Sequence, residues 1–274
     1  MEASIAFIGG GNMAAALIGG LLASGHSPAH VFVVEPRVER RSELTQRFGV
    51  ATAAQADEAL GRCDVWVLAV KPQVLPDVAR GLAALAAAHR PLLVSIAAGV
   101  GTDALAAWLQ SPLPIVRCMP NTPALIGAGA TALYARDDVD GRAREIAQTL
   151  LSGAGQTVWM NDEAALDAVT ATSGSGPAYF FAFMEAMQTA AGELGLAPDT
   201  ARLLVLHTAL GAARMALESG VDPGTLRSQV TSPGGTTERA LAILEEGGFD
   251  QLVAEAMRAA AGRSRQLGRE LANQ

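Results

Sequence analysis

Ile5-Ala6-Phe7-Ile8-Gly9-Gly10-Gly11-Asn12-Met13-Ala14 is the stretch that decides the fold of this 274-residue chain. A short apolar run, three glycines and an alanine-rich segment predict a strand, a tight turn and a helix. Gly9, Gly11 and Ala14 fit the G-x-G-x-x-A pattern, in which they permit the turn, the approach of a pyrophosphate and close helix packing. We therefore expect free N–H groups at the start of the helix to face the phosphates of a dinucleotide.

The same alternation of short apolar runs and helical runs continues from residue 4 to about residue 160. Runs such as Val65–Ala69 are apolar throughout, which suits strands buried on both faces. The pattern predicts an α/β fold with a doubly wound, mostly parallel sheet, a Rossmann domain over residues 1–161. The expected strands are Ile5–Ile8, Val31–Val34, Val65–Ala69, Leu92–Ile96, Ile115–Met119, Ala130–Tyr134 and Thr157–Trp159. The expected helices are Asn12–Ala23, Val38–Phe48, Val74–Leu85, Asp103–Leu109 and Val139–Leu151.

After Asp162 the strand signals stop, and residues 162–274 read as an all-helical domain. Proline residues occupy first-turn positions, while Gly195 and Gly220 lie just beyond helix ends, as helix starts and stops require. These helices are apolar on more than one face, which predicts burial against a second subunit and an oligomeric protein. The expected helices are Glu163–Thr172, Pro177–Leu194, Pro198–Ser219, Pro223–Val230, Thr236–Glu246 and Phe249–Ala272.

Composition excludes several classes of function. A formal net charge of -7 argues against binding nucleic acid or an anionic membrane surface, which leaves a small molecule as the expected partner. The apolar stretch from Ala201 to Leu217 contains three basic or titratable side chains, and the first residues carry no export signal, so we expect no membrane association. Cys63 and Cys118 form no C-x-x-C pair, which predicts neither disulfides nor a metal site and favours the cytoplasm.

The end of the second predicted strand carries opposing signals for the choice of cofactor. Glu35 lies 21 residues after Ala14, where an acidic side chain accepts hydrogen bonds from the ribose hydroxyls of NAD. Arg37, Arg40 and Arg41 follow, and guanidinium groups there suit the 2′-phosphate of NADP. A solvated helix face is the alternative for Arg40 and Arg41. NADP(H) is favoured, and NAD(H) remains the alternative.

Further loops are expected at the carboxyl edge of the sheet, where cofactors lie in open sheets. Ala69-Val70-Lys71-Pro72 and Ile96-Ala97-Ala98 each end a predicted strand. Proline beside Lys71 indicates a rigid loop, so a positioning role for Lys71 is favoured over proton transfer. The loop from Met119 to Pro123 is fixed by two prolines and either lines the active site or forms a simple turn.

Two glycine-rich segments lie in the helical part, Ser173-Gly174-Ser175-Gly176-Pro177-Ala178-Tyr179 and Ser232-Pro233-Gly234-Gly235-Thr236-Thr237-Glu238. The second combines a flexible backbone, two hydroxyl groups and the start of a helix, which together favour the binding of a small carboxylate. An ordinary capped turn is the alternative. We expect the substrate at this second segment.

The ordered set G-x-G-x-M-A, A-V-K-P, R-C-M-P-N-T-P, S-G-S-G-P-A-Y and S-P-G-G-T-T-E resembles the pyrroline-5-carboxylate reductase family over nearly the whole chain. The resemblance implies an oxidoreductase that uses NAD(P)H to reduce the C=N bond of 1-pyrroline-5-carboxylate to L-proline, the last step of proline biosynthesis. It also implies a helical dimerisation domain and a homodimer or a larger homo-oligomer such as a decamer.

The same resemblance implies roles for individual residues. Our own hypothesis is that Thr236 and Thr237 bind the substrate carboxylate and that Thr237, the catalytic candidate, also relays the proton. Glu35 stands where many relatives have Ser, Asn or Asp, and Gln229 stands where Asn is common. The implied substrate residues are Glu163, Gln229, Gly235, Thr236 and Thr237. The implied cofactor residues are Ile8, Gly9, Gly10, Gly11, Asn12, Met13, Glu35, Arg37, Ala69, Val70, Lys71, Pro72, Ile96, Ala97 and Ala98.

Two rival functions share parts of this pattern. A β-hydroxyacid dehydrogenase also joins a Rossmann domain to helices, but such enzymes usually place a catalytic lysine in the helical domain. Lys71 is the single lysine of this chain, and it lies in the predicted Rossmann domain. A non-catalytic sensor of the cofactor is the second rival, although a sensor would have little use for the segment that begins at Ser232.

Overall fold

A computed structural model describes residues 2–272, and the chain divides into two compact units. Residues up to Ser175 together with those from Ala259 onward form the first unit, and Gly176–Arg258 form the second. These units follow the packing of the chain, whereas the predicted boundary at 161/162 marks the end of the strand pattern. As a domain boundary, 161/162 stays a prediction.

The first unit contains an eight-stranded sheet in the order β3-β2-β1-β4-β5-β6-β7-β8. All neighbouring strands pair in parallel except β6 and β7, which pair antiparallel, so the predicted mostly parallel Rossmann sheet is confirmed. The strand order reverses between β1 and β4, the point at which open sheets of this type bind their ligands. The strands are β1 (Ile5–Ile8), β2 (Val31–Val34), β3 (Ala51–Ala53), β4 (Val65–Leu68), β5 (Leu92–Ser95), β6 (Ile115–Met119), β7 (Gly129–Ala135) and β8 (Gly155–Trp159).

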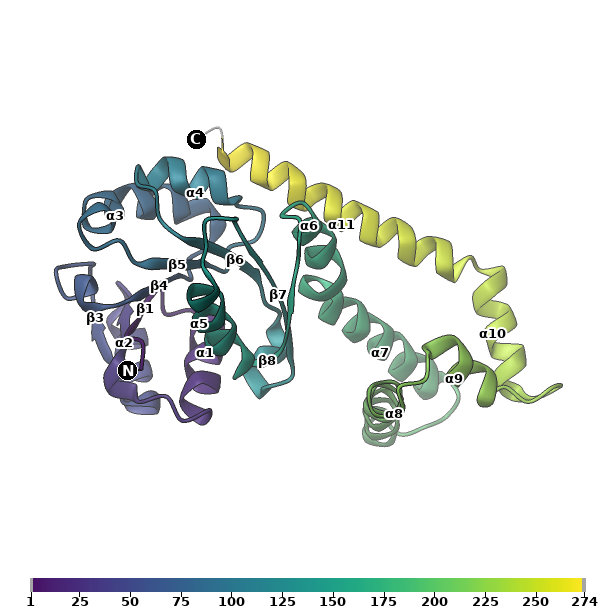
Figure 1. The fold of residues 1–274 in the computed structure, drawn as a ribbon. Coiled ribbons are helices and arrows are strands. Elements are labelled where there is room, and N and C mark those ends of the chain that lie inside the picture. Colours follow the sequence, from purple (N-terminus) through teal and green to yellow (C-terminus); the bar gives the residue numbers. More distant parts are fainter. Residues whose placement is uncertain (1, 273–274) are drawn as a thin grey trace. The chain divides into compact units, whose positions relative to one another are not determined.

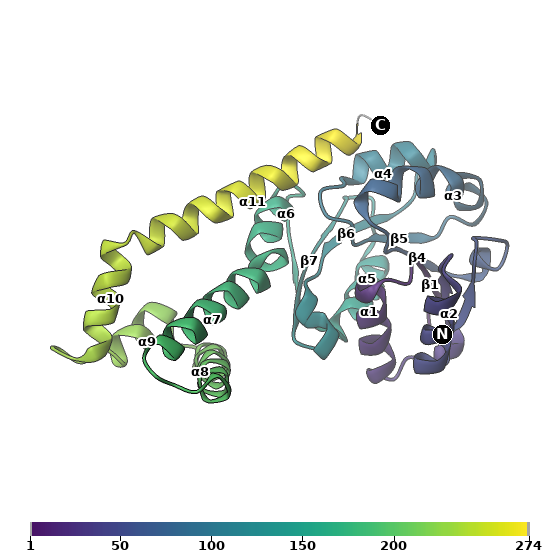
Figure 2. The same ribbon diagram turned by 180° about the vertical axis from the view of Figure 1, so that it is seen from behind.

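Helices cover both faces of this sheet (Figures 1 and 2). Alternate strand residues such as Phe7 and Val67 join α1, α2 and α5 in one buried cluster. Their neighbours Trp66 and Leu68 join α3, α4 and Leu271 of α11 in the other. The helices are α1 (Asn12–Ala23), α2 (Val38–Phe48), α3 (Leu75–His89), α4 (Thr102–Leu109), α5 (Gly141–Ser152) and α6 (Ala165–Val169). Short 3₁₀ turns occur at Pro28–His30, Leu60–Arg62, Pro72–Val74 and Thr122–Ile126.

Most predicted elements are present with ends shifted by a few residues, and three features were not predicted. β3 pairs with β2 at the edge of the sheet. β7 runs antiparallel to β6 because only nine residues, 120–128, connect them, which is too short for a parallel crossover. The predicted helix Glu163–Thr172 is α6 followed by a π-helical turn over Thr170–Gly174.

The second unit is helical, and its described residues bury few apolar side chains. Ala201 and Val205 are the only hydrophobic residues of 176–258 that are buried. Among residues 2–272, no helix combines the length and the apolar character that crossing a membrane requires. The helices are α7 (Gly176–Glu193), α8 (Pro198–Ser219), α9 (Pro223–Gln229), α10 (Thr236–Glu246) and α11 (Phe249–Ala272), the last of which continues into the first unit.

In the first unit, α1 contacts the turn after α5 backbone to backbone. A Cβ atom on Gly20 would lie 2.5 Å from the carbonyl carbon and oxygen of Gly153, so no side chain fits. We predict that Gly20→Ala lowers the free energy of unfolding by about 1–3 kcal/mol through overpacking, despite the better helix propensity of alanine. Urea denaturation at one protein concentration measures this change.

Gly81→Ala is the matched control, because Gly81 lies in α3 with open space around its position. Alanine there should leave the unfolding free energy unchanged or raise it by up to about 1 kcal/mol. Equal denaturation midpoints for Gly20→Ala and the wild type would show that the two backbones can separate without cost.

Candidate functional site

The turn between β1 and α1 has no room for a side chain at Gly9, whereas the space around Gly11 is open. Gly9 has φ +100°, and a Cβ atom on it would lie 2.7 Å from the carbonyl oxygen of Ala69, which follows β4. Gly11, the residue before α1, differs, because a Cβ atom there would meet nothing within 4 Å beyond its chain neighbours. Within the described chain, the N–H groups of residues 11–14 donate to no protein acceptor. Dinucleotide phosphates therefore fit against this turn.

Glu35, at the end of β2, is buried and uses both carboxylate oxygens within the protein. Oε2 accepts the N–H of Gly10 at 3.0 Å, and Oε1 accepts the N–H and the Nε–H of Arg37 at 3.1 and 2.9 Å. Burial by itself raises the pKa of Glu35, but the hydrogen bonds from Arg37 and Gly10 outweigh it, so this pKa lies below its ordinary value. Glu35 is thus a carboxylate that already has protein donors.

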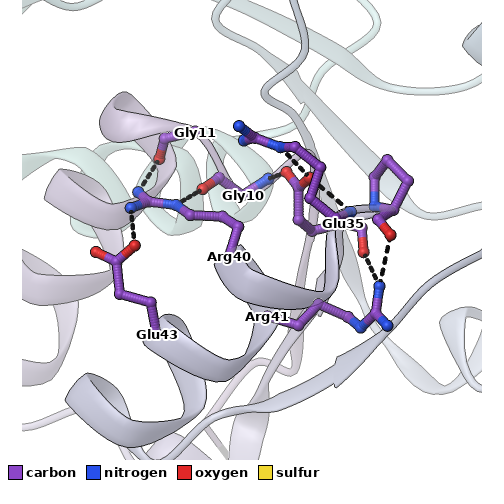
Figure 3. Close-up of polar contacts among 8 residues, drawn as sticks. Gly10, Gly11, Glu35, Arg40, Arg41 and Glu43 are labelled. Atoms are coloured by element: carbon purple, nitrogen blue, oxygen red, sulfur yellow. Dashed lines mark hydrogen bonds and ion pairs between the residues drawn. The ribbon is translucent and has the colours of Figure 1, made fainter.

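The three arginines that follow Glu35 have different partners (Figure 3). Arg37 has a side chain that is 65% exposed and donates through Nε to Glu35. Arg40, with a side chain only 14% exposed, donates to the carbonyl oxygens of Gly10 and Gly11 and pairs with Glu43. Arg41 donates to the carbonyl oxygens of Glu35 and Pro36 at 2.8 and 2.7 Å. A solvated helix face therefore does not describe Arg40 or Arg41.

A cleft of about 640 Å³ lies at the carboxyl edge of β1, β2 and β4. Its walls include residues that the sequence did not single out: Ala54, Gln55 and Ala56 after β3, Val74 before α3, and Asp77, Val78, Gly81 and Leu82 of α3. Recognition of β3 as a strand would have placed the first group at this edge. The predicted cofactor residues that line the cleft are Ile8, Gly9, Gly11, Glu35, Arg37, Ala69, Val70 and Lys71.

The other predicted cofactor residues lie outside the lining of this cleft. Asn12 lines a smaller hollow of about 270 Å³ beside the start of α2, together with Arg37, which also lines the larger cleft. Gly10 faces Leu44 and Glu35 behind the turn. Met13 lies in the first turn of α1, and Pro72 begins a 3₁₀ turn. Ile96, Ala97 and Ala98 follow β5 in the first unit. As contacts to a cofactor, these residues and those that line the cleft stay predictions.

Glu163, a predicted substrate residue, connects three parts of the first unit. Its carboxylate accepts the N–H and the hydroxyl of Thr102 at 2.8 Å each, at the start of α4. It also pairs at 3.1 Å with Arg117 of β6, whose side chain is nearly buried. Since Glu163 remains partly exposed, a substrate contact is compatible with these bonds, and it stays a prediction.

In the second unit, the segment from Ser232 to Glu238 forms the turn into α10. Gly235 is the residue before the helix and supplies no side-chain cap, while the Glu238 carboxylate accepts the N–H of Gly234 at 2.7 Å. Thr236 and Thr237 follow as the first two helical residues, so their N–H groups lie at the positive end of the helix dipole. Gln229 is the exposed last residue of α9. As the site of a substrate carboxylate, the start of α10 stays a prediction.

Comparisons with known proteins match both parts of the chain. A family model described as "Pyrroline-5-carboxylate reductase dimerisation" matches residues 163–267, and one described as "NADP oxidoreductase coenzyme F420-dependent" matches residues 4–99. The chain is 51% identical to "Pyrroline-5-carboxylate reductase" of Pseudomonas aeruginosa over 97% of both chains. It is 45% identical to that of Pasteurella multocida, over 96% of this chain and 97% of the relative.

Solved structures agree with this result. A pyrroline-5-carboxylate reductase from Coxiella burnetii is 41% identical with a TM-score of 0.92, covering 97% of this chain and 99% of that one. The pyrroline carboxylate reductase of Plasmodium falciparum "with NADP bound" is 29% identical with a TM-score of 0.86, covering 98% and 99%. On this near full-length similarity, and with the open glycine turn and the α10 turn that the family's motifs predict, the chain belongs to the pyrroline-5-carboxylate reductase family.

Proposed function

We propose that this protein transfers a hydride from a reduced nicotinamide dinucleotide to the C=N carbon of 1-pyrroline-5-carboxylate, with a proton added to the nitrogen, to yield L-proline. The observation that carries the proposal is the 51% identity to a pyrroline-5-carboxylate reductase over 97% of the chain. The open turn at Gly11 supports it, because dinucleotide phosphates need that space.

The residues of this chain contribute mainly by positioning the substrate. A protonated cyclic imine is already a good electrophile, so no strong general acid is required. The nicotinamide supplies the hydride when it is bound. Holding two reactants in a productive geometry contributes roughly 7–11 kcal/mol to lowering a barrier. We assign Thr236 and Thr237 to the substrate carboxylate, with Gly235, Gln229 and Glu163 as further contacts, and we assign Thr237 to relay the proton.

The proposal favours NADP(H) over NAD(H). The two terminal nitrogens of Arg37 donate to no described residue, and the Arg37 side chain lines the cleft. Both oxygens of Glu35 already accept protein donors, so this residue has less capacity to accept the ribose hydroxyls of NAD. A guanidinium held in this way suits the 2′-phosphate of NADP.

We further propose that the protein is a homodimer, built through the second unit, that can assemble further. Large apolar side chains of this unit are exposed: Phe180 at 68%, Phe181 at 63%, Leu194 at 86% and Leu217 at 83%. Exposure on this scale marks an interface with another chain. Cys63 and Cys118 are both free thiols, as in a reducing compartment, and a cytoplasmic location is part of the proposal.

The proposal predicts that the purified protein oxidises NADPH, and NADH less efficiently, only when 1-pyrroline-5-carboxylate is present. Loss of absorbance at the reduced-nicotinamide band measures the rate, and L-proline is quantified as the product. Binding of either cofactor without turnover of this imine would reject the assigned substrate, and it would favour another imine or a sensor.

Thr237→Ala should lower kcat/KM for the imine by about tenfold to a hundredfold, the effect of losing one hydrogen bond to a charged group. The Kd of the cofactor should stay unchanged, because Thr237 is assigned to the substrate carboxylate and to no part of the cofactor. Thr237→Ser keeps the hydroxyl and should recover most of the activity. Thr189→Ala, which removes a hydroxyl that bonds within α7, is the control. Normal imine turnover by Thr237→Ala would reject the assignment.

Arg37→Met should raise the KM for NADPH by about tenfold or more and leave the KM for NADH within about twofold, since only NADPH carries the 2′-phosphate. The two KM values are compared at one ionic strength, because charge contacts are screened by salt. Arg62→Met removes an exposed positive charge of the same unit and serves as the control. An equal loss with both cofactors would place Arg37 away from the 2′-phosphate.

A further inference from the structure

Arg40 makes an unusual set of contacts for a residue on the first turn of an exposed helix. Its side chain reaches from α2 to the glycine turn, where Nε donates to the carbonyl oxygen of Gly10 at 2.5 Å and an NH2 group donates to that of Gly11 at 3.1 Å (Figure 3). The remaining NH2 group pairs with Glu43 at 2.6 Å. All three guanidinium nitrogens therefore have protein acceptors.

Gly10 is held on both of its backbone polar groups by side chains of opposite charge. Glu35 accepts its N–H at 3.0 Å, while Arg40 donates to its carbonyl oxygen. A Cβ atom at this position would lie 2.7 Å from Leu44 and 3.2 Å from Cβ of Glu35, so the residue is also confined sterically. The orientation of the turn is thus fixed by residues of β2 and α2.

This orientation determines where the free N–H groups of the turn point. In a planar trans peptide the C=O and N–H vectors are opposed. Because the Gly10 carbonyl oxygen is bonded to Arg40, the N–H group of Gly11 points away from Arg40. The Gly11 carbonyl oxygen accepts both the Arg40 side chain and the N–H of Ala15 in α1, so Arg40 and the first helical bond together orient the N–H group of Asn12. These are N–H groups that no protein acceptor uses in the described chain.

We propose that Arg40 is a positioning residue for the dinucleotide: it holds the glycine turn in the conformation that presents its N–H groups to the pyrophosphate. This inference rests on the proposed use of a nicotinamide dinucleotide. It gives two of the three arginines different tasks, with Arg37 directed to the 2′-phosphate and Arg40 acting through the backbone on the part that NADPH and NADH share.

The test compares the Kd of NADPH and of NADH, measured by fluorescence titration on the full-length protein, for wild type, Arg40→Met and Arg40→Lys. We expect Arg40→Met to weaken both cofactors by the same factor, about tenfold, since two charge-assisted bonds to the turn are lost. Arg40→Lys keeps the charge but not the planar fork, so it should also weaken both equally. The ratio of the two Kd values should stay at its wild-type value in each variant.

Two controls separate this role from simpler ones. Arg47→Met removes a positive charge from the same helix, where Arg47 lies over the Phe48 ring, and it should leave both Kd values unchanged. Arg37→Met should shift the Kd of NADPH alone. Circular dichroism and the Tm of each variant verify the fold, and Arg40→Lys together with Arg40→Gln provides the test if Arg40→Met is unfolded.

Three outcomes would overturn the inference: wild-type affinities in Arg40→Met, a loss confined to NADPH, or full recovery in Arg40→Lys. The second would make Arg40 a reader of the 2′-phosphate, and the third would reduce its role to charge. If the wild type binds neither cofactor, the proposed function itself fails, whereas normal binding by the variants with an active wild type rejects the role of Arg40 alone.

Discussion

At Gly9 the chain turns from β1 toward α1 with φ +100°, and any side chain there would lie 2.7 Å from the backbone of Ala69. The ends of β1 and β4 can approach this closely only without a side chain, and the cofactor cleft opens at the point where these two strands meet. Ala14, which is fully buried, then lets α1 pack onto the sheet. The close approach of β1 to β4 is therefore set by backbone contact, and the charged side chains of Glu35 and Arg40 then bond to the peptide groups of Gly10 in the turn.

Those charged side chains show why the choice of cofactor stayed open at the level of sequence. An acidic residue after β2 favours NAD and nearby arginines favour NADP, so the same short segment supports both interpretations. The structure shows which atoms of these side chains are already bonded within the protein. Glu35 and Arg40 are engaged by the turn itself, and Arg37 keeps its terminal nitrogens free of described partners.

The parts of the fold that the sequence predicted with correct bounds are strands formed by continuous apolar runs and helices formed by long runs of helix-forming residues. β1, β2, β6, α1, α2, α8, α10 and α11 have the expected bounds. β3 was missed because Ala-Thr-Ala is short, partly exposed and lacks the apolar run of an inner strand. The contacts of Arg40 were not predictable, because a charge on a helix does not reveal a partner 30 positions away in the chain. The bonds of Glu163 to Thr102 and Arg117 were hidden for the same reason.

The two units differ in how they can be stable. The first unit buries two apolar clusters, one on each face of its sheet. Burial on this scale offsets the conformational entropy lost when the chain is ordered. In the second, Ala201 and Val205 are the only buried hydrophobic residues of 176–258, while phenylalanine and leucine side chains of α7 and α8 are exposed. Fixing the backbone costs roughly 1–2 kcal/mol per residue, so two buried side chains cannot hold these helices folded. The proposed dimer would add apolar contacts to these helices by covering side chains that are exposed in a single chain. Thr236 and Thr237 belong to this unit, so binding of the substrate carboxylate depends on the association of two chains. The glycine turn belongs to the first unit, so its conformation does not depend on that association.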